Sequence, residues 1–266
     1  GGRWDATTTW VGGVVPGAGD KVVIPSGSEV IVRGPYTTAA PAVCWSLTVQ
    51  GTLTIGTPLS AGARGLQVDS LVLVESGGLL RNDGADIHAL FVGGDLVVNG
   101  QVNFRNGSGS ARMVFNGIGI QTLSGAADIL DLPVLNVEKV LGELYGSGTI
   151  KLKVEELNMV SGTFFGPTNL EVGTLLKIKD GEFFSGESMT LLGNLVVENG
   201  GFSAAAGTVR FAGQTQAVTS IPQIDFGKVV IAAQSVTEFN GKSKISGDLL
   251  VSDGATFNCG NAIEVV

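Results

Sequence analysis

Short apolar runs that alternate with polar positions recur along the whole chain, and each run ends at glycine. Most copies place a small or polar residue before Leu-x-Val or a similar apolar run. The clear copies are Ser46–Leu53, Ser70–Leu79, Gly94–Phe104, Gly193–Phe202 and Gly247–Phe257, and weaker ones are Glu156–Phe164 and Thr174–Phe183. Alternation with a period of two predicts strands, and the glycines predict turns. The pattern therefore predicts short strands with little or no helix.

The copies are regularly spaced. Their anchoring leucines are Leu47, Leu71, Leu96, Leu157, Leu176, Leu195 and Leu249. Neighbouring copies lie 24, 25, 19 and 19 residues apart where none is missing. A longer repeat fills the gaps, because Arg112–Gly117, Gln121 and Val134–Val137 are echoed by Thr208–Gly213, Gln216 and Lys228–Ile231.

A repeat of this length, with two or three strands and glycine corners, is typical of a β-solenoid. We expect an all-β, single-stranded parallel β-helix of about a dozen coils at the usual strand spacing. Leucine, valine and phenylalanine at the repeated positions are expected to stack inside it. The alternative is a β-sandwich or barrel with coincidental turn spacing, but sandwich strands seldom repeat so closely in sequence.

The first 45 residues carry a different pattern. From Trp4 and Trp10 onward they read W…W-x-G-G-x-x-P-x-x-G-D-x-V-x-I-P-x-G-x-x-V. This opening resembles the extracellular domain family named for its eight glycines, and the rest resembles β-helical repeats of large bacterial surface and secreted proteins. The resemblance implies a right-handed parallel β-helix, an extracellular or cell-surface location after removal of a leader peptide, and adhesive or glycan-associated roles. It supplies no catalytic residues.

Residues 1–45 are therefore expected to form a cap with the first coils, and residues 46–266 a solenoid body continuous with it. A solenoid end exposes apolar cross-section and unpaired strand edges, so it needs a cover. Trp4 and Trp10 suit that task, with sugar stacking as their alternative.

The last residues, Ile263, Val265 and Val266, read as a strand without a cap. We expect copies to associate head to tail into a surface filament or fibre. The candidate assembly residues are Trp4, Trp10, Cys44, Cys259, Ile263, Val265 and Val266. In a solenoid Cys44 and Cys259 lie too far apart for an internal disulfide, so a bridge between two copies and two unreactive thiols are the alternatives.

Composition supports a packed protein. Glycine supplies 41 of 266 residues, which is typical of a chain with many turns. Hydrophobic residues make up 44% and charged residues only 15%, which argues against disorder. The formal charge of −8 and the lack of a basic cluster argue against nucleic acid as a partner. No apolar run is long enough for a membrane helix, so membrane insertion is not expected.

Candidate chemistry is sparse. The densest polar group contains Asp83, Asp86 and the sole histidine, His88, and is a weak candidate for a metal site or an acid–base pair. Because some β-helices are polysaccharide lyases or hydrolases, further candidates are the acids Asp128, Asp131, Glu155, Glu156, Asp180 and Glu182. Asn106–Ser108 is a glycosylation sequon.

We therefore predict a structural or adhesive protein that is not an enzyme and needs no cofactor, with calcium at scattered Asp and Asn corners left open. A carbohydrate-active enzyme and a non-catalytic module that binds surface glycans remain the alternatives. The enzyme requires a groove with converging carboxylates, and the module requires exposed aromatic rings.

Overall fold

The computed structural model describes residues 1–57, 62–105, 109–260 and 263–266. The predicted sequon at residues 106–108 lies outside these ranges. The described chain is an all-β solenoid of parallel stacked coils, with about 11 turns in total. Its secondary structure contains one short 3₁₀ helix, η1 (Thr7–Thr9), within the described ranges. None of the described helical structure has the length and hydropathy needed to span a membrane. The chain divides into two compact units, Gly1–Leu135 and Asn136–Val266.

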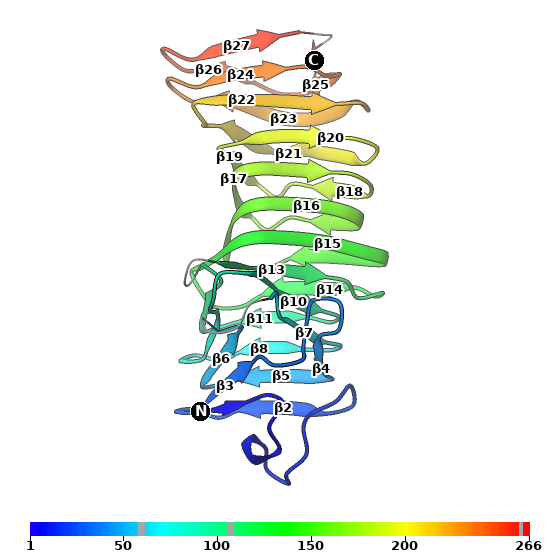
Figure 1. Cartoon of the computed structure of the whole chain (residues 1–266). Helices are drawn as coiled ribbons and strands as arrows, with labels where there is room; N and C mark the ends of the chain where they lie inside the picture. Colours follow the sequence, from blue (N-terminus) through cyan, green and yellow to red (C-terminus); the bar gives the residue numbers. More distant parts are fainter. Residues whose placement is uncertain (58–61, 106–108, 261–262) are drawn as a thin grey trace. The chain divides into compact units, whose positions relative to one another are not determined.

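In the first unit, strands from successive coils form three parallel sheets (Figure 1). Sheet A contains β1 (Gly2–Arg3), β3 (Glu29–Val32), β6 (Thr52–Ile55), β9 (Leu79–Asn82) and β12 (Gln101–Asn103). Sheet B contains β2 (Lys21–Ile24), β5 (Ser46–Val49), β8 (Val72–Val74), β11 (Leu96–Val98) and β14 (Gln121–Ser124). Sheet C contains β4 (Ala42–Cys44), β7 (Gly65–Val68), β10 (Ile87–Val92) and β13 (Ser110–Phe115). The unit boundary falls within β15 (Ile129–Gly146).

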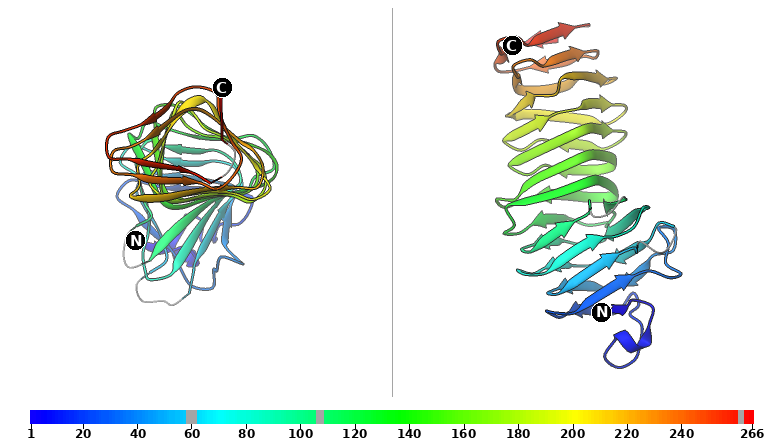
Figure 2. Two further views of the ribbon diagram at one scale, coloured as in Figure 1. Left: turned by 90° about the horizontal axis from the view of Figure 1, so that it is seen from above. Right: turned by 60° about the vertical axis from the view of Figure 1, so that its left-hand side comes forward.

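The second unit repeats this arrangement with longer strands that turn corners (Figure 2). Sheet D joins residues 152–154 of β16 (Lys151–Phe165), 170–172 of β17 (Asn169–Ile178), β19 (Ser188–Leu191), 208–211 of β21 (Gly201–Phe211), 228–231 of β23 (Ile224–Ile231) and β26 (Leu249–Val251). Sheet E joins residues 156–159 of β16, 175–178 of β17, β20 (Asn194–Val197), β22 (Thr215–Ser220), β24 (Val236–Phe239) and β27 (Thr256–Cys259). Sheet F joins residues 163–165 of β16, β18 (Glu182–Phe184), the start of β21, the start of β23, β25 (Ser243–Ile245) and β28 (Ile263–Val265).

Apolar side chains stack inside the coils in columns, as the repeats predict. Leu157, Leu176 and Leu195 occupy one register position in three successive coils, and all three are completely buried. A phenylalanine column beside them starts at Phe164 and Phe183, whose ring centroids are 5.6 Å apart. Burial of each such side chain contributes roughly 1.5–3 kcal/mol to folding, so the columns are the main source of stability.

Two of the predicted anchoring leucines do not occupy the column that the repeat spacing predicts for them. Leu47 aligns with Val72, so the prediction that Leu71 continues this column is wrong. Leu249 aligns with Val229 in sheet D, whereas the Leu195 column runs through sheet E. The Gly-Asp/Asn-Leu pattern marks a glycine corner that leads into a strand, and such corners precede strands of more than one sheet.

The predicted corner glycines are places where neighbouring coils approach closely. A Cβ atom at Gly94 would overlap the carbonyl of Ser70, and one at Gly193 would overlap the carbonyl of Thr174. These two glycines precede Leu96 and Leu195 in the repeat, so their spacing follows from the coil geometry.

Candidate functional site

The predicted metal group at residues 83–88 is a backbone-binding arrangement. His88 is buried on β10, where its Nδ1 accepts a hydrogen bond from the N–H of Arg64 at 2.9 Å. Its Nε2 lies 2.9 Å from the carbonyl oxygen of Asp83, so Nε2 carries the proton and donates it to that oxygen. Burial is the main cause that lowers the pKa of His88, which favours the neutral ring. His88 thus links two successive corners of the first unit.

The two aspartates of this group also bind backbone. Asp86 accepts the N–H of Gly62 at 2.7 Å, and Asp83 accepts the N–H of Gly84 at 2.9 Å. Within the ranges that the structure describes, no three His, Cys, Asp or Glu side chains are grouped to hold a metal ion. Asp83, Asp86 and His88 are therefore close in sequence, but their side chains bind different backbone groups.

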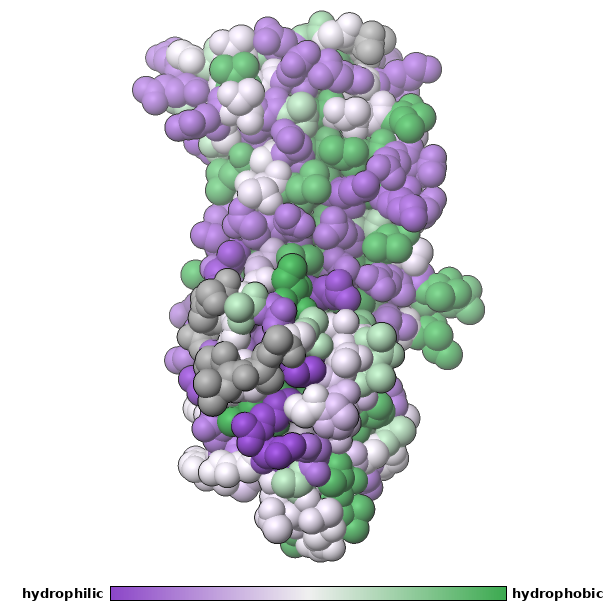
Figure 3. Space-filling view, in the orientation of Figure 1, coloured by the Kyte–Doolittle hydropathy of each residue, from purple (hydrophilic) through white to green (hydrophobic). Residues whose placement is uncertain are grey.

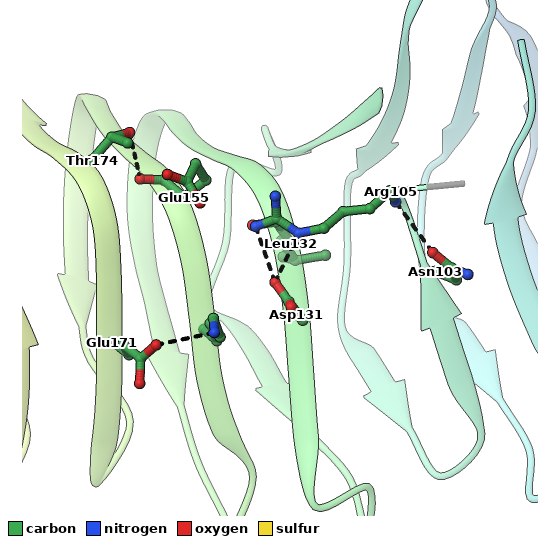
Figure 4. Close-up of polar contacts among 8 residues, drawn as sticks. Asn103, Arg105, Asp131, Leu132, Glu155, Glu171 and Thr174 are labelled. Atoms are coloured by element: carbon green, nitrogen blue, oxygen red, sulfur yellow. Dashed lines mark hydrogen bonds and ion pairs between the residues drawn. The ribbon is translucent and has the colours of Figure 1, made fainter. Parts of the chain in front are cut away.

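The candidate carboxylates are spread over several coils. In the first unit Arg105 donates to Asp131 at 3.1 Å and to the carbonyl of Leu132 at 3.2 Å (Figure 4). In the second unit Thr174 donates its hydroxyl to the carbonyl oxygen of Glu155 at 3.0 Å. The Glu182 carboxylate lies over Gly201 of the next coil.

One carboxylate with a shifted pKa was not predicted from the sequence. Glu171 on β17, labelled in Figure 4, contacts Lys151 at 2.9 Å and Lys153 at 3.2 Å; neither lysine is labelled there. The hydrogen bond from Lys151 is the main cause that lowers the pKa of Glu171, so this side chain is ionised at neutral pH and unsuited to act as a general acid. The Lys153–Glu171 ion pair follows from the register of two neighbouring coils, in which Lys153 aligns with Glu171.

An outward-facing aromatic stack was also missed. Tyr145, Phe165 and Phe184 lie half-buried, with ring centroids 4.6 Å and 4.9 Å apart and interplanar angles of 10° and 12°. The rings therefore cover one another's faces. The doublets Phe164–Phe165 and Phe183–Phe184 are the sequence signal for this stack, because one ring of each doublet points inward and the next points outward.

The N-terminal residues cover the first coil. Trp4 is completely buried, so we assign it to the cap and not to a contact between copies. Trp10 packs edge-on against it at 5.1 Å, and the Trp10 indole N–H donates to the carbonyl of Trp4 at 2.8 Å. The inward-facing Val22 and Ile24 of the first coil are also buried.

A cavity of about 690 Å³ lies between this cap and β2. Its walls include the half-buried Trp10 and the exposed side chains of Val11, Val14 and Val23. Hydrophobic surface is visible at the cap, at the lower end of the view in Figure 3. On its other side β2 pairs with β5, and no further described strand pairs with β2.

Inward-facing side chains of the last described coil are more exposed than those of the coil before it. Val251 is 43% exposed although its column neighbour Ile231 is completely buried, and Val265 is 57% exposed above the buried Ile245. Cys259 follows the buried Phe239 in its column and is exposed, whereas Cys44 is buried on β4. The two cysteines do not form a disulfide with each other. Ile263 is half-buried and Val266 is exposed.

No protein-family model, curated protein or solved structure matches this chain in the three comparisons.

Proposed function

We propose that this chain is a structural β-solenoid whose copies associate end to end. One observation carries the proposal: inward-facing columns are buried in the first coil and exposed in the last. Val22 is 4% exposed, whereas Val251 is 43% exposed and Val265 is 57% exposed. A contact with a second copy would bury these side chains and provide partners for free strand edges. Because head and tail differ, repeated contacts of this kind run on into a fibre unless the rotation closes.

An extracellular or cell-surface adhesive role is the setting that we propose for such an assembly. It is supported by the resemblance of the opening pattern around Trp4 and Trp10 to extracellular domains. The two alternatives receive less support from the site geometry. In the stack of Tyr145, Phe165 and Phe184, Phe165 lies between the other two rings, whereas a sugar needs an uncovered ring face. The candidate acids are spread over several coils, and Asp131 accepts a hydrogen bond from Arg105.

Light scattering coupled to size-exclusion chromatography, over a hundredfold range of protein concentration, tests the association. We expect the mean mass to rise with concentration and short fibres to be visible by electron microscopy. Val265→Glu should reduce association, because it places a charge at the exposed column end.

Ile221→Glu is the matched control, since Ile221 is an exposed aliphatic residue at a corner away from the last coil, with 75% exposure against 57% for Val265. A monomer at every concentration would overturn the proposal. Equal losses in both variants would also contradict it, because they would point to unspecific hydrophobic aggregation.

A further inference from the structure

We propose that the cavity between the N-terminal cap and β2 binds a small amphipathic carboxylate. The aliphatic chain of the ligand lies against Trp10, Val14 and Val23, and its carboxylate lies at Lys21. An alkyl carboxylate such as a medium-chain fatty acid belongs to this chemical class. The site goes beyond the proposed assembly and does not depend on association between copies.

The cavity is large enough for a small ligand. Its volume of about 690 Å³ falls within the range of roughly 300–1,000 Å³ that is usual for small-molecule sites. Its lining comes from residues 1–30, so one part of the first unit forms the whole site. Val22 and Ile24 in the lining are already buried, so the surface for a ligand comes from lining residues that are exposed or half-buried.

One part of this lining is apolar. The side chains of Val14 and Val23 are exposed, and Trp10 is half-buried. The indole N–H of Trp10 already donates to the carbonyl of Trp4 at 2.8 Å, so the ring offers apolar surface to the cavity. A ligand with an aliphatic chain would remove this surface from water, which favours its binding.

Lys21 supplies a positive charge beside the apolar surface. Within the ranges that the structure describes, the Lys21 ammonium has no ion pair or hydrogen bond. The two acids of the lining are already engaged, because Glu29 forms an ion pair with Arg81 at 3.0 Å and Asp20 accepts the N–H of Gly17 at 2.8 Å. The charge that remains to be paired in this cavity is therefore positive, and it favours an anionic ligand group.

The edge of β2 adds backbone donors at the same place. The carbonyl of Ile24 accepts the N–H of Gln50 at 2.9 Å, so Ile24 presents its backbone groups to the β5 side. Because successive residues of a strand present their backbone groups to alternate edges, Lys21 and Val23 present theirs to the opposite edge. In the described part of the chain neither of these two N–H groups has a partner. A carboxylate at this edge would accept them while it contacts the ammonium.

Other classes of ligand fit this lining less well. A cationic ligand would lie beside Lys21, while Asp20 and Glu29 already have partners. A neutral aliphatic ligand would cover the ammonium and the strand edge without replacing their hydrogen bonds to water, which is costly. An aliphatic chain with a terminal carboxylate satisfies both parts of the cavity.

Isothermal titration calorimetry with sodium octanoate tests the site, and we expect one octanoate to bind per chain. Lys21→Met should weaken binding about tenfold, because it keeps the side-chain length and removes the ammonium. Lys242→Met is the matched control, since Lys242 is an exposed lysine of the second unit and the charge change is the same. It should leave the affinity within about twofold of wild type.

A second pair of variants tests the apolar part. Val14→Ser should weaken octanoate binding roughly fivefold, because it removes part of the apolar lining. Val140→Ser is its control, since Val140 is an exposed valine of the second unit, and its affinity should stay within about twofold of wild type. Thermal unfolding by circular dichroism verifies that each variant is folded.

The ligand itself can also be varied. Octan-1-ol has the same chain without the charge, so wild type should bind it about tenfold more weakly than octanoate. Lys21→Met should bind the two compounds about equally, because the partner of the carboxylate is gone. Hexanoate should bind wild type about tenfold more weakly than octanoate, because two methylene groups fewer are buried.

Nuclear magnetic resonance locates the carboxylate. The backbone amide signals of Lys21 and Val23 should shift when octanoate is added. The signal of Thr48, the register partner of Val23 on β5, should shift far less.

Three results would overturn the proposal. The first is the absence of heat and of amide shifts up to ~10 mM octanoate, a concentration that would detect even weak binding. The second is equal affinity of wild type for octanoate and octan-1-ol, which would exclude a carboxylate site. The third is binding that neither Lys21→Met nor Val14→Ser weakens, because the octanoate would then lie elsewhere on the molecule.

Discussion

Gln121 and Gln216 hold equivalent positions in two different coils and make the same hydrogen bonds. The Gln121 amide accepts the N–H of Gly117 at 3.1 Å and donates to the carbonyls of Val92 and Gly94. The Gln216 amide accepts the N–H of Gly213 at 2.7 Å and donates to the carbonyls of Leu191 and Gly193. Both side chains are buried, so each ties a corner to the preceding coil with a nearly complete set of partners.

Replacement of Gln216 by leucine should lower the free energy of unfolding by about 2–3 kcal/mol. Leucine fills a similar volume but leaves a buried N–H and two carbonyls with fewer partners. Urea denaturation followed by circular dichroism measures the change. Gln214→Leu is the control, because the Gln214 side chain is exposed on the same corner. Equal stabilities of the two variants would mean that the buried amide has no structural role.

Replacement of Gly193 by alanine should destabilise the chain by about 2–4 kcal/mol, because the new methyl group would overlap the carbonyl of Thr174 and separate two coils. Gly119→Ala provides the comparison, since a Cβ at Gly119 would meet no atom within 4 Å. We expect Gly119→Ala to melt within about 2 °C of wild type. A tolerated alanine at position 193 would contradict the close approach of these coils.

The solenoid was predictable because its repeat is local in sequence. The interval between Leu157 and Leu176 is one coil, and alternation separates inward from outward side chains. The register was less predictable in Leu71–Val74, where four consecutive apolar residues give no phase and Val72 rather than Leu71 joins the column. Only the pairing with the neighbouring coil decides between them.

The candidate site was less predictable, because its contacts join residues of different coils. The polar run that contains His88 indicates an exposed turn. In the structure the ring is buried and accepts a hydrogen bond from the backbone N–H of Arg64 in the preceding coil. The Lys153–Glu171 pair and the outward stack of Phe165 on Phe184 likewise depend on which strands lie side by side. Sequence spacing suggests which strands are neighbours, but it does not determine which side-chain atoms are in contact.

Stability should decrease in mild acid through His88. The folded-state pKa of His88 is lowered, chiefly by burial, so below pH 6.5 the unfolded chain takes up a proton that the native ring resists. The unfolding free energy therefore falls as pH falls, by at most about 1.4 kcal/mol per pH unit for this one proton. A protonated Nδ1 would also face the N–H of Arg64.

The difference between wild type and His88→Gln, measured by urea denaturation from pH 8 to pH 5, isolates this effect from the carboxylates. We expect the difference to shrink as the pH is lowered. A constant difference would show that the proton on His88 is not linked to folding.

The two thiols should react very differently. Burial raises the pKa of Cys44 to about 12, so at pH 8 only on the order of 10⁻⁴ of it is thiolate. Cys259 is exposed. Titration with a chromogenic disulfide should detect one thiol per native chain within minutes and two in denaturant. Cys259→Ser should leave no fast-reacting thiol, and a fast signal in that variant would contradict the burial of Cys44.

Lys139 continues the inward phase of β15 and is buried on the side where Val137 also points. Burial lowers its pKa from 10.5 to about 8, so the native state holds this proton less firmly than the unfolded chain does. Between pH 8 and pH 10.5 the unfolded chain binds more protons than the native chain. The contribution of Lys139 to the free energy of unfolding therefore rises with pH in this range. Below pH 8 both states are charged and the penalty of burial is constant.

Lys139→Met keeps the side-chain length and removes the titrating ammonium, so the variant should lack the pH dependence that Lys139 contributes. The stability of wild type relative to the variant should then rise as pH rises from 8 toward 10. Comparing the two proteins at each pH cancels the opposite effect of Cys44, whose raised pKa makes native stability fall above pH 9. If the difference does not change with pH, the Lys139 ammonium keeps its water contact in the native chain, and the inward phase of β15 ends before it.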